Sequence, residues 1–304
     1  METVDTNPSH AVSPAALAAL LGQPDTPLIL DVRRPERFAQ SLHRLPLSQH
    51  VAPDALVGWM QHRPPEAVVL YCVYGHEVSQ NAAARLRAAG WDARYLLGGI
   101  EGGEPGVDDP GLLTSLQATP APRLRQRPDL GVTGVGRSRW ITRERPKIDR
   151  IACPWLIRRF IDREAEFFFA PTGEVLEQAG RLNAIAFDLP GAPISHEGER
   201  CSFDSLLGAF GLELPALQRL AHIVRGADID RLDLAAPAAG LLAVSLGMSR
   251  RHADNDHALL AAMMPVYDAL YAFGGRSFAI WDENGWLVWV SGAVIEKFIA
   301  SDDC

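Results

Sequence analysis

One cysteine lies where an apolar strand pattern passes through a short glycine-containing loop into a helix pattern. The segment YCVYGHEVS at 71–79 places Cys72 at the end of that strand. In such a loop the backbone N–H groups can converge on the sulfur, and the start of the helix adds positive potential. Both effects favour the thiolate and would hold an anionic persulfide. A cysteine that merely packs at the strand end is the alternative, and the loop context favours the reactive thiol.

A dense group of cations lies in residues 137–163, which hold 9 basic and 3 acidic residues. The pattern predicts a helix with Pro154 at its first helical position. Arg143, Lys147 and Arg150 come just before it, and helix N–H groups combined with such cations bind tetrahedral oxyanions. A solvated helix face, paired with the acidic remainder of the domain, is the alternative that the pattern alone favours. The oxyanion site is assigned to Lys147, Arg150, Arg158 and Arg159.

Three polar residues further along could hold a metal ion. His196 and Cys201 lie in one polar segment, and Asp228 lies at the end of a helix pattern. Together they would form a ligand set of mixed softness. No paired spacing such as HxxxH supports this assignment. A histidine and a cysteine that are satisfied within a loop therefore remain the favoured interpretation.

The elements that would position Cys72 are strands that alternate with helices. Short apolar runs predict strands at 28–32, 67–71 and 93–96. Helix patterns occupy 53–60 and 79–89, between and after these strands. Alternation of this kind predicts a doubly wound parallel α/β domain.

The length of 304 residues suggests two domains at about 100–200 residues each. We expect a first domain at 1–105, a linker at 106–137 and a second domain at 138–304. The linker is rich in glycine and proline and lacks sustained periodicity.

The second domain is expected to be mainly helical, in an α+β arrangement. Its patterns predict helices at 214–224, ended by Gly226, at 239–248, and at 254–273, kinked or broken near Pro265. Strands at 278–282 and 286–290 flank an Asn-Gly turn signal, which predicts a hairpin.

The composition restricts the compartment and the partners. The chain has four cysteines without a CxxC pair, which fits a reduced cytoplasm. No apolar run is long enough to span a membrane, and the N-terminus has no basic region typical of a secretory signal. A net charge of −8 argues against a chain built to coat nucleic acid. We therefore expect a cytoplasmic protein without membrane contact or direct nucleic-acid binding.

Four short motifs occur in a fixed order in the first domain. They are LDVR at 30–33, HRLP at 43–46, the six-residue loop that starts at Cys72, and YLLGG at 95–99. Together they resemble the rhodanese (sulfurtransferase) family over roughly residues 12–103. The resemblance implies that Cys72 takes a sulfane sulfur from a donor and passes it to a thiophilic acceptor. The other site residues are Gly75 and His76 in the cradle, Asp31 and Arg33 from the first strand, and Glu77 and Ser79.

One loop position departs from the family pattern. Active sulfurtransferases often carry arginine or lysine at the position that Glu77 occupies here. A cation there would stabilise an anionic donor such as thiosulfate, whereas a carboxylate would repel it. His76 would offset this repulsion when it is protonated. An uncharged or cationic donor, or a redox-sensing use of the thiol, therefore stays open.

The second domain carries a distinctive block at 140–162 that contains RPKIDR and CPWLIRRFID. It is followed in order by FDLPG, His196, CSF, RGAD, GLLA and YDALY. These motifs resemble the C-terminal domain of the chromate resistance protein B family over about residues 138–273. The resemblance implies a role in chromate resistance. No helix-turn-helix pattern is evident, which disfavours a direct regulator of transcription.

We therefore expect a rhodanese-like sulfurtransferase fused to an oxyanion-binding domain that acts in chromate resistance. The expected partners are a sulfane sulfur donor, a thiol acceptor, and chromate or another oxyanion. A homo-oligomer and a metal ion in the second domain stay open, and no other cofactor is assigned. The competing hypothesis is a non-enzymatic chromate or redox sensor, or a scaffold, that uses an inactive rhodanese fold.

Overall fold

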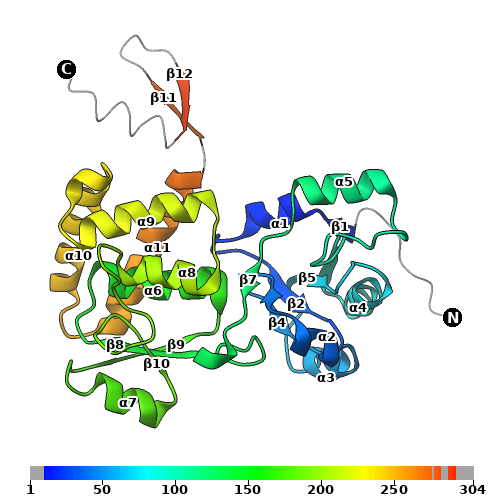
Figure 1. Ribbon diagram of the computed structural model, residues 1–304, viewed down its shortest axis with the longest axis horizontal. Coiled ribbons are helices and arrows are strands. Elements are labelled where there is room, and N and C mark those ends of the chain that lie inside the picture. The colour runs from blue at the N-terminus through cyan, green and yellow to red at the C-terminus, as the bar shows by residue number, and fades with distance from the viewer. Residues whose placement is uncertain (1–9, 276, 282–286, 292–304) are drawn as a thin grey trace. The chain divides into compact units, whose positions relative to one another are not determined.

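The computed structural model describes residues 10–275, 277–281 and 287–291, and the chain forms two compact units (Figure 1). The first unit takes Met1–Arg137 and Arg159–Glu164, and the second takes Ser138–Arg158 and Ala165–Cys304. Within the described ranges, no helix combines the length and the apolar character needed to cross a bilayer.

A five-stranded sheet forms the centre of the first unit. Its strands are β1 (Ala11–Val12), β2 (Leu28–Asp31), β4 (Gln49–His50), β5 (Ala67–Tyr71) and β6 (Asp92–Leu96). The strand order is β1-β6-β5-β2-β4, and all neighbouring strands run parallel. The central strands β2 and β5 are almost wholly buried, as expected for strands covered on both faces. The predicted parallel α/β fold is confirmed.

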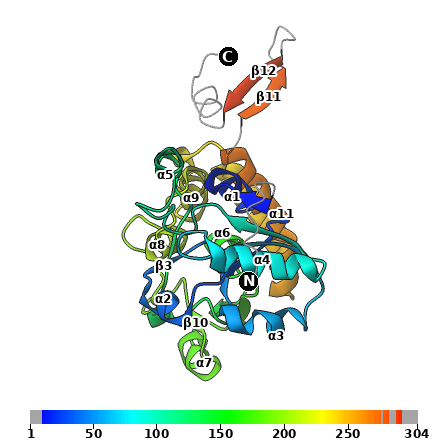
Figure 2. The same cartoon turned by 90° about the vertical axis from the view of Figure 1, so that its right-hand side faces the viewer.

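Helices cover this sheet on both sides. Figures 1 and 2 show α1 and α5 above the sheet, and α2 and α3 below it. The apolar side chains that face β5 from α4, Ala83 and Leu86, are fully buried. The helices are α1 (Pro14–Leu20), α2 (Pro35–Gln40), α3 (Leu56–Met60) after a 3-10 turn at Pro53–Ala55, α4 (Glu77–Ala88) and α5 (Pro110–Ala118).

The segment expected to link the domains contains regular structure and falls in the first unit. Its helix α5 begins at Pro110, where the side chain of Asp109 accepts hydrogen bonds from the Gly111 and Leu112 amides at 2.8 and 3.1 Å. Further on, β7 (Leu124–Arg125) pairs antiparallel with β3 (His43–Arg44). The sequence analysis expected a linker here because of the glycine and proline content. The structure instead has a helix that is capped by Asp109 and buries Leu116.

The second unit contains a three-stranded parallel sheet that the sequence did not predict. Its order is β10-β8-β9, with β8 (Arg139–Arg143), β9 (Glu166–Ala170) and β10 (Ile185–Ala186). Helix α7 (Val175–Leu182) packs on β8. The predicted hairpin is confirmed as β11 (Ser277–Trp281) and β12 (Leu287–Ser291), which run antiparallel (Figure 2). Its Asn-Gly turn lies outside the described residues.

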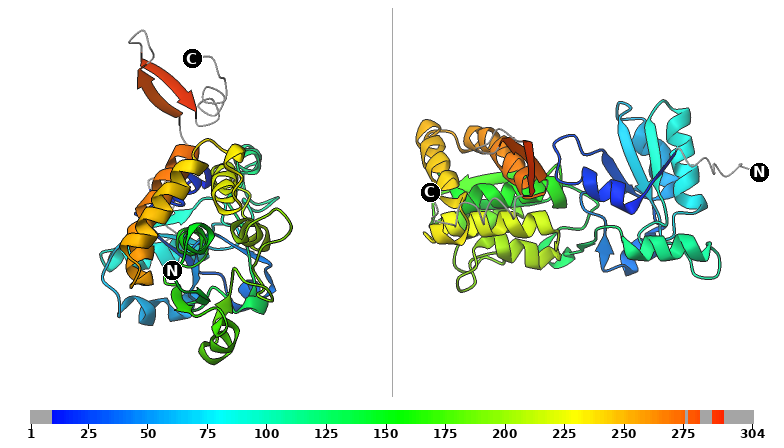
Figure 3. Two further views of the ribbon diagram at one scale, coloured as in Figure 1. Left: turned by 90° about the vertical axis from the view of Figure 1, so that its left-hand side faces the viewer. Right: turned by 90° about the horizontal axis from the view of Figure 1, so that it is seen from above.

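The remaining helices of the second unit pack around α6 (Ile148–Leu156), which contacts α8, α9 and α11. In both views of Figure 3 the yellow-to-orange helices α9, α10 and α11 lie side by side. The long helix α11 is not broken at Pro265. These elements are α8 (Ser202–Phe210), α9 (Pro215–Asp228), α10 (Ala238–Arg251) and α11 (Asp256–Gly275), with a 3-10 turn at Leu232–Leu234.

Two predicted helix boundaries were wrong. Pro154 lies inside α6 rather than at its start, because Ile148 and Ile151 already belong to the buried face of the helix. Proline has no N–H to donate to the preceding turn, and the chain continues as a π-helical turn at Ile157–Ile161. Gly226 does not end α9 either. A Cβ there would lie 2.9 Å from the Arg231 carbonyl oxygen, so this glycine permits close packing.

A glycine turn after β6 packs directly against the loop that follows Cys72. A Cβ at Gly99 would lie 2.5 Å from the Gly75 nitrogen and 2.5 Å from the Val73 oxygen. Gly75 and Gly99 both have positive φ, at 79° and 58°. The Ile100 amide donates to the Cys72 carbonyl at 3.1 Å. The turn therefore fixes the position of the loop, and neither glycine has room for a side chain.

Replacing Gly99 with alanine is expected to destabilise the first unit by about 2–5 kcal/mol, from the positive φ and the steric overlap. Urea unfolding of the full chain measures the change. Gly58→Ala is the control, because Gly58 lies in α3 with nothing within 4 Å of an added Cβ, and it should be neutral or stabilising. Equal stabilities for the two variants would contradict the packing of this turn.

Candidate functional site

Cys72 follows β5 directly, and its side chain is 5% exposed. Its Sγ lies 3.2 Å from the hydroxyl oxygen of Ser79, a buried residue in the first turn of α4. The Cys72 sulfur therefore lies between the end of β5 and the first turn of α4, in the strand-loop-helix arrangement that the sequence predicted. Ser79 is placed to exchange a hydrogen bond with the sulfur.

The loop between β5 and α4 presents main-chain N–H groups. Within the described part of the chain, the N–H groups of residues 73–76 donate to no protein acceptor. The carbonyls of Cys72 and Val73, by contrast, accept from the amides of Ile100 and Glu101 at 3.1 and 2.9 Å. The loop is therefore anchored through its carbonyls and keeps amide donors for an anion.

A cavity of about 220 Å³ opens onto Cys72. Its walls carry charges of both signs. Two of the arginines lie between β2 and α2, and the third lies in α2. The glutamates lie at the start of α4 and in the turn after β6. Its charged lining residues are Arg33, Arg34, Arg37, His76, Glu77 and Glu104.

His76 is held by two carboxylates. Its Nε2 lies 2.9 Å from Asp108 Oδ2, and its Nδ1 lies 3.5 Å from Glu104 Oε2. Burial alone would raise the pKa of Asp108, but the Glu104 amide and His76 outweigh it and lower that pKa. The sequence analysis missed both carboxylates. The sequence analysis expected a protonated His76 to offset the negative charge of Glu77. In the structure, Asp108 and Glu104 also lie beside His76 and would share its positive charge.

Asp31 and Arg33 form a buried ion pair at the end of β2. Arg33 Nη2 lies 2.5 Å from Asp31 Oδ2, and the Tyr71 hydroxyl donates to the same oxygen at 2.6 Å. Burial and the Asp31 charge raise the pKa of Tyr71 well above its usual value. The pair links β2 to β5 immediately before Cys72 and places Arg33 in the cavity wall.

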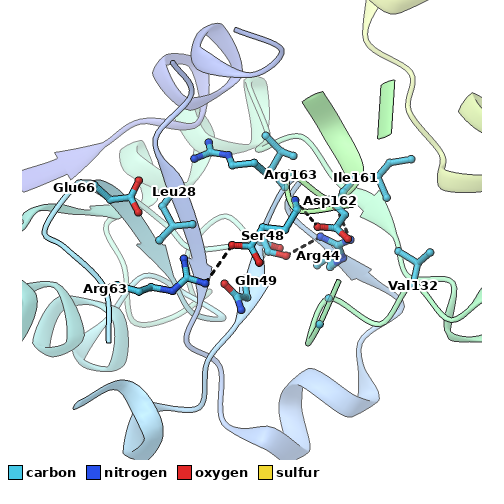
Figure 4. Close-up of a pocket in the computed structure, with 14 residues that line it drawn as sticks. Leu28, Arg44, Ser48, Gln49, Arg63, Glu66, Val132, Ile161, Asp162 and Arg163 are labelled. Atoms are coloured by element: carbon cyan, nitrogen blue, oxygen red, sulfur yellow. Dashed lines mark hydrogen bonds and ion pairs between the residues drawn. The ribbon is translucent and has the colours of Figure 1, made fainter. Parts of the chain in front are cut away.

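A second cavity of the first unit, about 160 Å³, surrounds the buried Arg44 (Figure 4). Arg44 donates to the carbonyls of Ser48 and Ile161 at 2.8 and 2.9 Å. Burial lowers its pKa. Nearby, Arg63 pairs with Glu164 at 3.3 Å. The cations that line this cavity already pair with groups of the first unit. Their contacts to Ile161 and Glu164 hold Arg159–Glu164 against the rest of that unit.

The second unit has a basic cavity of about 460 Å³ at the N-terminus of α6. It brings together the predicted Lys147 and Arg150. Arg158 and Arg159 are not part of its lining: Arg158 lies over the Phe167 ring at 5.0 Å, and Arg159 belongs to the first unit. The cations that line it are Arg143, Arg145, Lys147, Arg150 and Arg250, together with the single acid Glu144.

The buried carboxylate of Asp188 pairs with two of these cations, Arg143 and Arg150. Its Oδ2 accepts from Arg143 Nη2 at 2.7 Å and lies 3.2 Å from Arg150 Nε. Its Oδ1 accepts from the Ser202 hydroxyl at 3.0 Å. Burial and the neighbouring Arg143 lower the pKa of Arg150.

Asp188 also belongs to a cluster in which three carboxylates surround a histidine. The Nε2 atom of His196 lies 3.4 Å from Asp149 Oδ2, 3.2 Å from Asp188 Oδ1 and 3.2 Å from Asp228 Oδ2. A hydrogen bond with Asp149 and the neighbouring charges raise the pKa of His196 to about 9. Desolvation and the other two carboxylates raise the pKa of Asp228 to about 7.

The predicted metal ligands come together only in part. His196 and Asp228 are neighbours, but Cys201 caps α8, with its Sγ 3.4 Å from Asp204 Oδ2. Burial and the Asp149 charge raise the pKa of Cys201. Asp149 takes its place among the ligand atoms. This aspartate lies within the basic block, where no spacing pattern marked it as a ligand.

Family comparisons also divide the chain into two parts, although residues 159–164 fall in the second match and in the first structural unit. Residues 13–104 match the family model described as Rhodanese-like domain, and residues 140–274 match the one described as ChrB, C-terminal domain. The Choice-of-anchor I domain model matches 246–303 and overlaps the ChrB match.

One curated relative matches the second region. Protein ChrB of Cupriavidus metallidurans (strain CH34) is 41% identical over 135 residues, which cover 43% of this chain and 39% of that protein. The chain thus spans less than half the length of this relative.

Solved structures match the first region. A rhodanese homologue from Thermus thermophilus is 34% identical over 30% of this chain and 97% of that one, with a TM-score of 0.25. Thiosulfate sulfurtransferase from Pseudomonas aeruginosa is 21% identical over 37% of this chain and 19% of that one, with a TM-score of 0.27.

Asp108 gives a prediction for pH dependence. Because its pKa is lowered in the folded protein, its stabilising effect is present above the unfolded pKa of about 3.9 and is lost as the pH falls through the folded value. Asp108→Asn should lower the free energy of unfolding by about 1 kcal/mol at pH 7. This difference between variant and wild type should disappear below about pH 4. Urea unfolding at both pH values measures it. Asp92→Asn, at an exposed carboxylate, should show no such gap, and a gap at Asp108 independent of pH would contradict the pairing.

Proposed function

We propose, from the premise that this chain joins a rhodanese-like domain to a ChrB C-terminal domain, that Cys72 carries sulfane sulfur as a persulfide. The observation that carries the proposal is the environment of the sulfur. The four main-chain N–H groups of residues 73–76 have no acceptor among the residues that the structure describes, and the Ser79 hydroxyl lies 3.2 Å from Sγ. A persulfide anion extends one sulfur beyond Cys72 and would accept hydrogen bonds from such a loop.

The transfer is a pair of displacements at sulfur. The Cys72 thiolate attacks the outer sulfur of a donor persulfide R–S–SH, the S–S bond of the donor breaks, and R–S⁻ leaves and is protonated. An acceptor thiolate then attacks the outer sulfur on Cys72, and the Cys72 thiolate is the leaving group. No external oxidant or reductant is required, since each step exchanges one S–S bond for another.

The walls of the cavity favour a donor that carries both charges. Arg34 and Arg37 suit a carboxylate, while Glu77 and Glu104 suit an ammonium group. A small persulfide with both groups, such as cysteine or glutathione persulfide, matches this lining. Thiosulfate is a dianion, so the two glutamates oppose it.

Intact-protein mass after incubation with each donor tests the sulfur transfer. We expect an adduct of one sulfur atom on the wild type with cysteine or glutathione persulfide, less of it with thiosulfate, and none on Cys72→Ser. Cys304→Ser, which removes a different thiol, is the control and should load fully. No adduct from any donor would contradict the proposal and favour a sensing or structural thiol.

A second function is supported by the basic cavity of the second unit, which we assign to an oxyanion. Five cations and one carboxylate line this cavity, and Asp188 pairs with two of the cations. Lys147 has no ion-pair partner among the described residues. Lys147 also stands at the N-cap of α6, where free helix amides favour an anion. The resemblance to the chromate resistance family makes chromate the first ligand to test.

Calorimetric titration with chromate, and with sulfate as a non-oxidising analogue, measures this binding. Lys147→Gln should weaken it by about tenfold, as expected for one lost charge-assisted hydrogen bond. Arg231→Gln removes an exposed cation of the same unit that pairs with Asp233, and it should bind as the wild type does. Equal weakening in both variants, or no binding to the wild type, would contradict the assignment.

A further inference from the structure

We propose that Asp149, His196 and Asp228, which share a cluster with Asp188, bind one divalent first-row transition-metal ion. The three ligands come from distinct segments: the first turn of α6, the segment after β10, and the last residue of α9. One ligand atom from each lies within 4.8 Å of the others.

The spacing of the ligand atoms fits a common ion. His196 Nε2 lies 3.4 Å from Asp149 Oδ2 and 3.2 Å from Asp228 Oδ2. Ligand atoms bonded to Zn²⁺ at about 2.0–2.2 Å are separated by about 3.3–3.6 Å in a tetrahedral arrangement, which follows from those bond lengths. These two separations match those around a bound ion, and the ligand atoms of Asp149 and Asp228 lie within 4.8 Å of each other.

The carboxylates of the cluster converge on one imidazole nitrogen. A single imidazole N–H can donate strongly to one carboxylate, yet three carboxylate oxygens lie within 3.4 Å of His196 Nε2. A metal ion bonded to Nε2 would serve two of these carboxylates at once.

The charges of the cluster fit a divalent ion once the His196 imidazole has released its proton to the solvent. Asp188 already pairs with Arg143 and Arg150, which leaves the carboxylates of Asp149 and Asp228 for the ion. These two negative charges balance one divalent ion with a neutral imidazole.

The surrounding fold holds the ligands in place. Asp149 is 1% exposed, and its two oxygens accept from the Ser202 and Phe203 amides at 2.7 and 2.9 Å, so the start of α8 fixes its rotamer. The His196 side chain is 39% exposed, which leaves an entry path and room for water ligands. One imidazole nitrogen with two carboxylate oxygens suits Zn²⁺ or Mn²⁺ better than Ca²⁺ or Cu⁺.

Metal binding to the chelator-treated full chain tests the site, with Zn²⁺ and Co²⁺ as the probes. We expect one ion per chain, a higher Tm on Zn²⁺ addition, and Co²⁺ absorption bands typical of nitrogen and oxygen ligands. His196→Gln and Asp228→Asn should weaken Zn²⁺ binding at least tenfold. His222→Gln and Asp233→Asn are the controls, because both side chains are exposed in the same unit, and they should bind as the wild type does.

The outcome can be separated from folding defects and from the sulfur chemistry. Circular dichroism of each apo variant establishes whether it folds, and the milder His196→Gln change keeps the proposal testable where Asp228→Asn is unstable. Substoichiometric binding by the wild type, or Zn²⁺ affinity that is unchanged in folded His196→Gln, would overturn the site. Neither result affects persulfide loading, which depends on Cys72 in the other unit.

Discussion

Buried carboxylates organise both units of this protein, because a carboxylate removed from water must be met by donors or cations. In the first unit Asp31 engages Arg33 and links β2 to β5. In the second unit Asp149 accepts the first amides of α8, and Asp188 holds two arginines of the basic cavity. Each carboxylate thereby fixes the backbone beside a candidate site. Removal of any of them would leave buried donors or charges without partners.

In the proposed function, the two candidate sites would obtain anion affinity in different ways. The loop after Cys72 relies on main-chain amides, which the glycine turn after β6 keeps in position while Gly75 passes through a left-handed conformation. The basic cavity relies on side-chain cations around the N-terminus of α6. Amides suit a sulfur that is covalently carried, since they bind it without adding a competing nucleophile. Cations suit a free oxyanion that must be drawn from solvent.

The sequence predicted local features well and long-range partners poorly. Cys72 and Ser79 lie within one strand-loop-helix motif, so their proximity follows from local structure. The partners of His76, Glu104 and Asp108, come from a segment whose glycines and prolines suggested a linker, and only the tertiary fold brings them close. The sequence did not indicate a role for Asp149 either, because it lies among cations. Its contacts to the start of α8 appear only in the tertiary structure. The prediction placed the start of α6 at Pro154, because proline favours the first position of a helix. Burial of the residues before it outweighed that preference, and the helix begins at Ile148.

The central claim of the account is that Cys72 passes sulfur on as well as accepting it. The most direct test is a single-turnover experiment in which protein loaded with radiolabelled sulfane sulfur is mixed with excess acceptor thiol. The account predicts that the label leaves the protein in stoichiometric amount and appears as the persulfide of the acceptor, with the Cys72 thiol regenerated. Label that stays on the protein would contradict transfer and would leave Cys72 as a sensor.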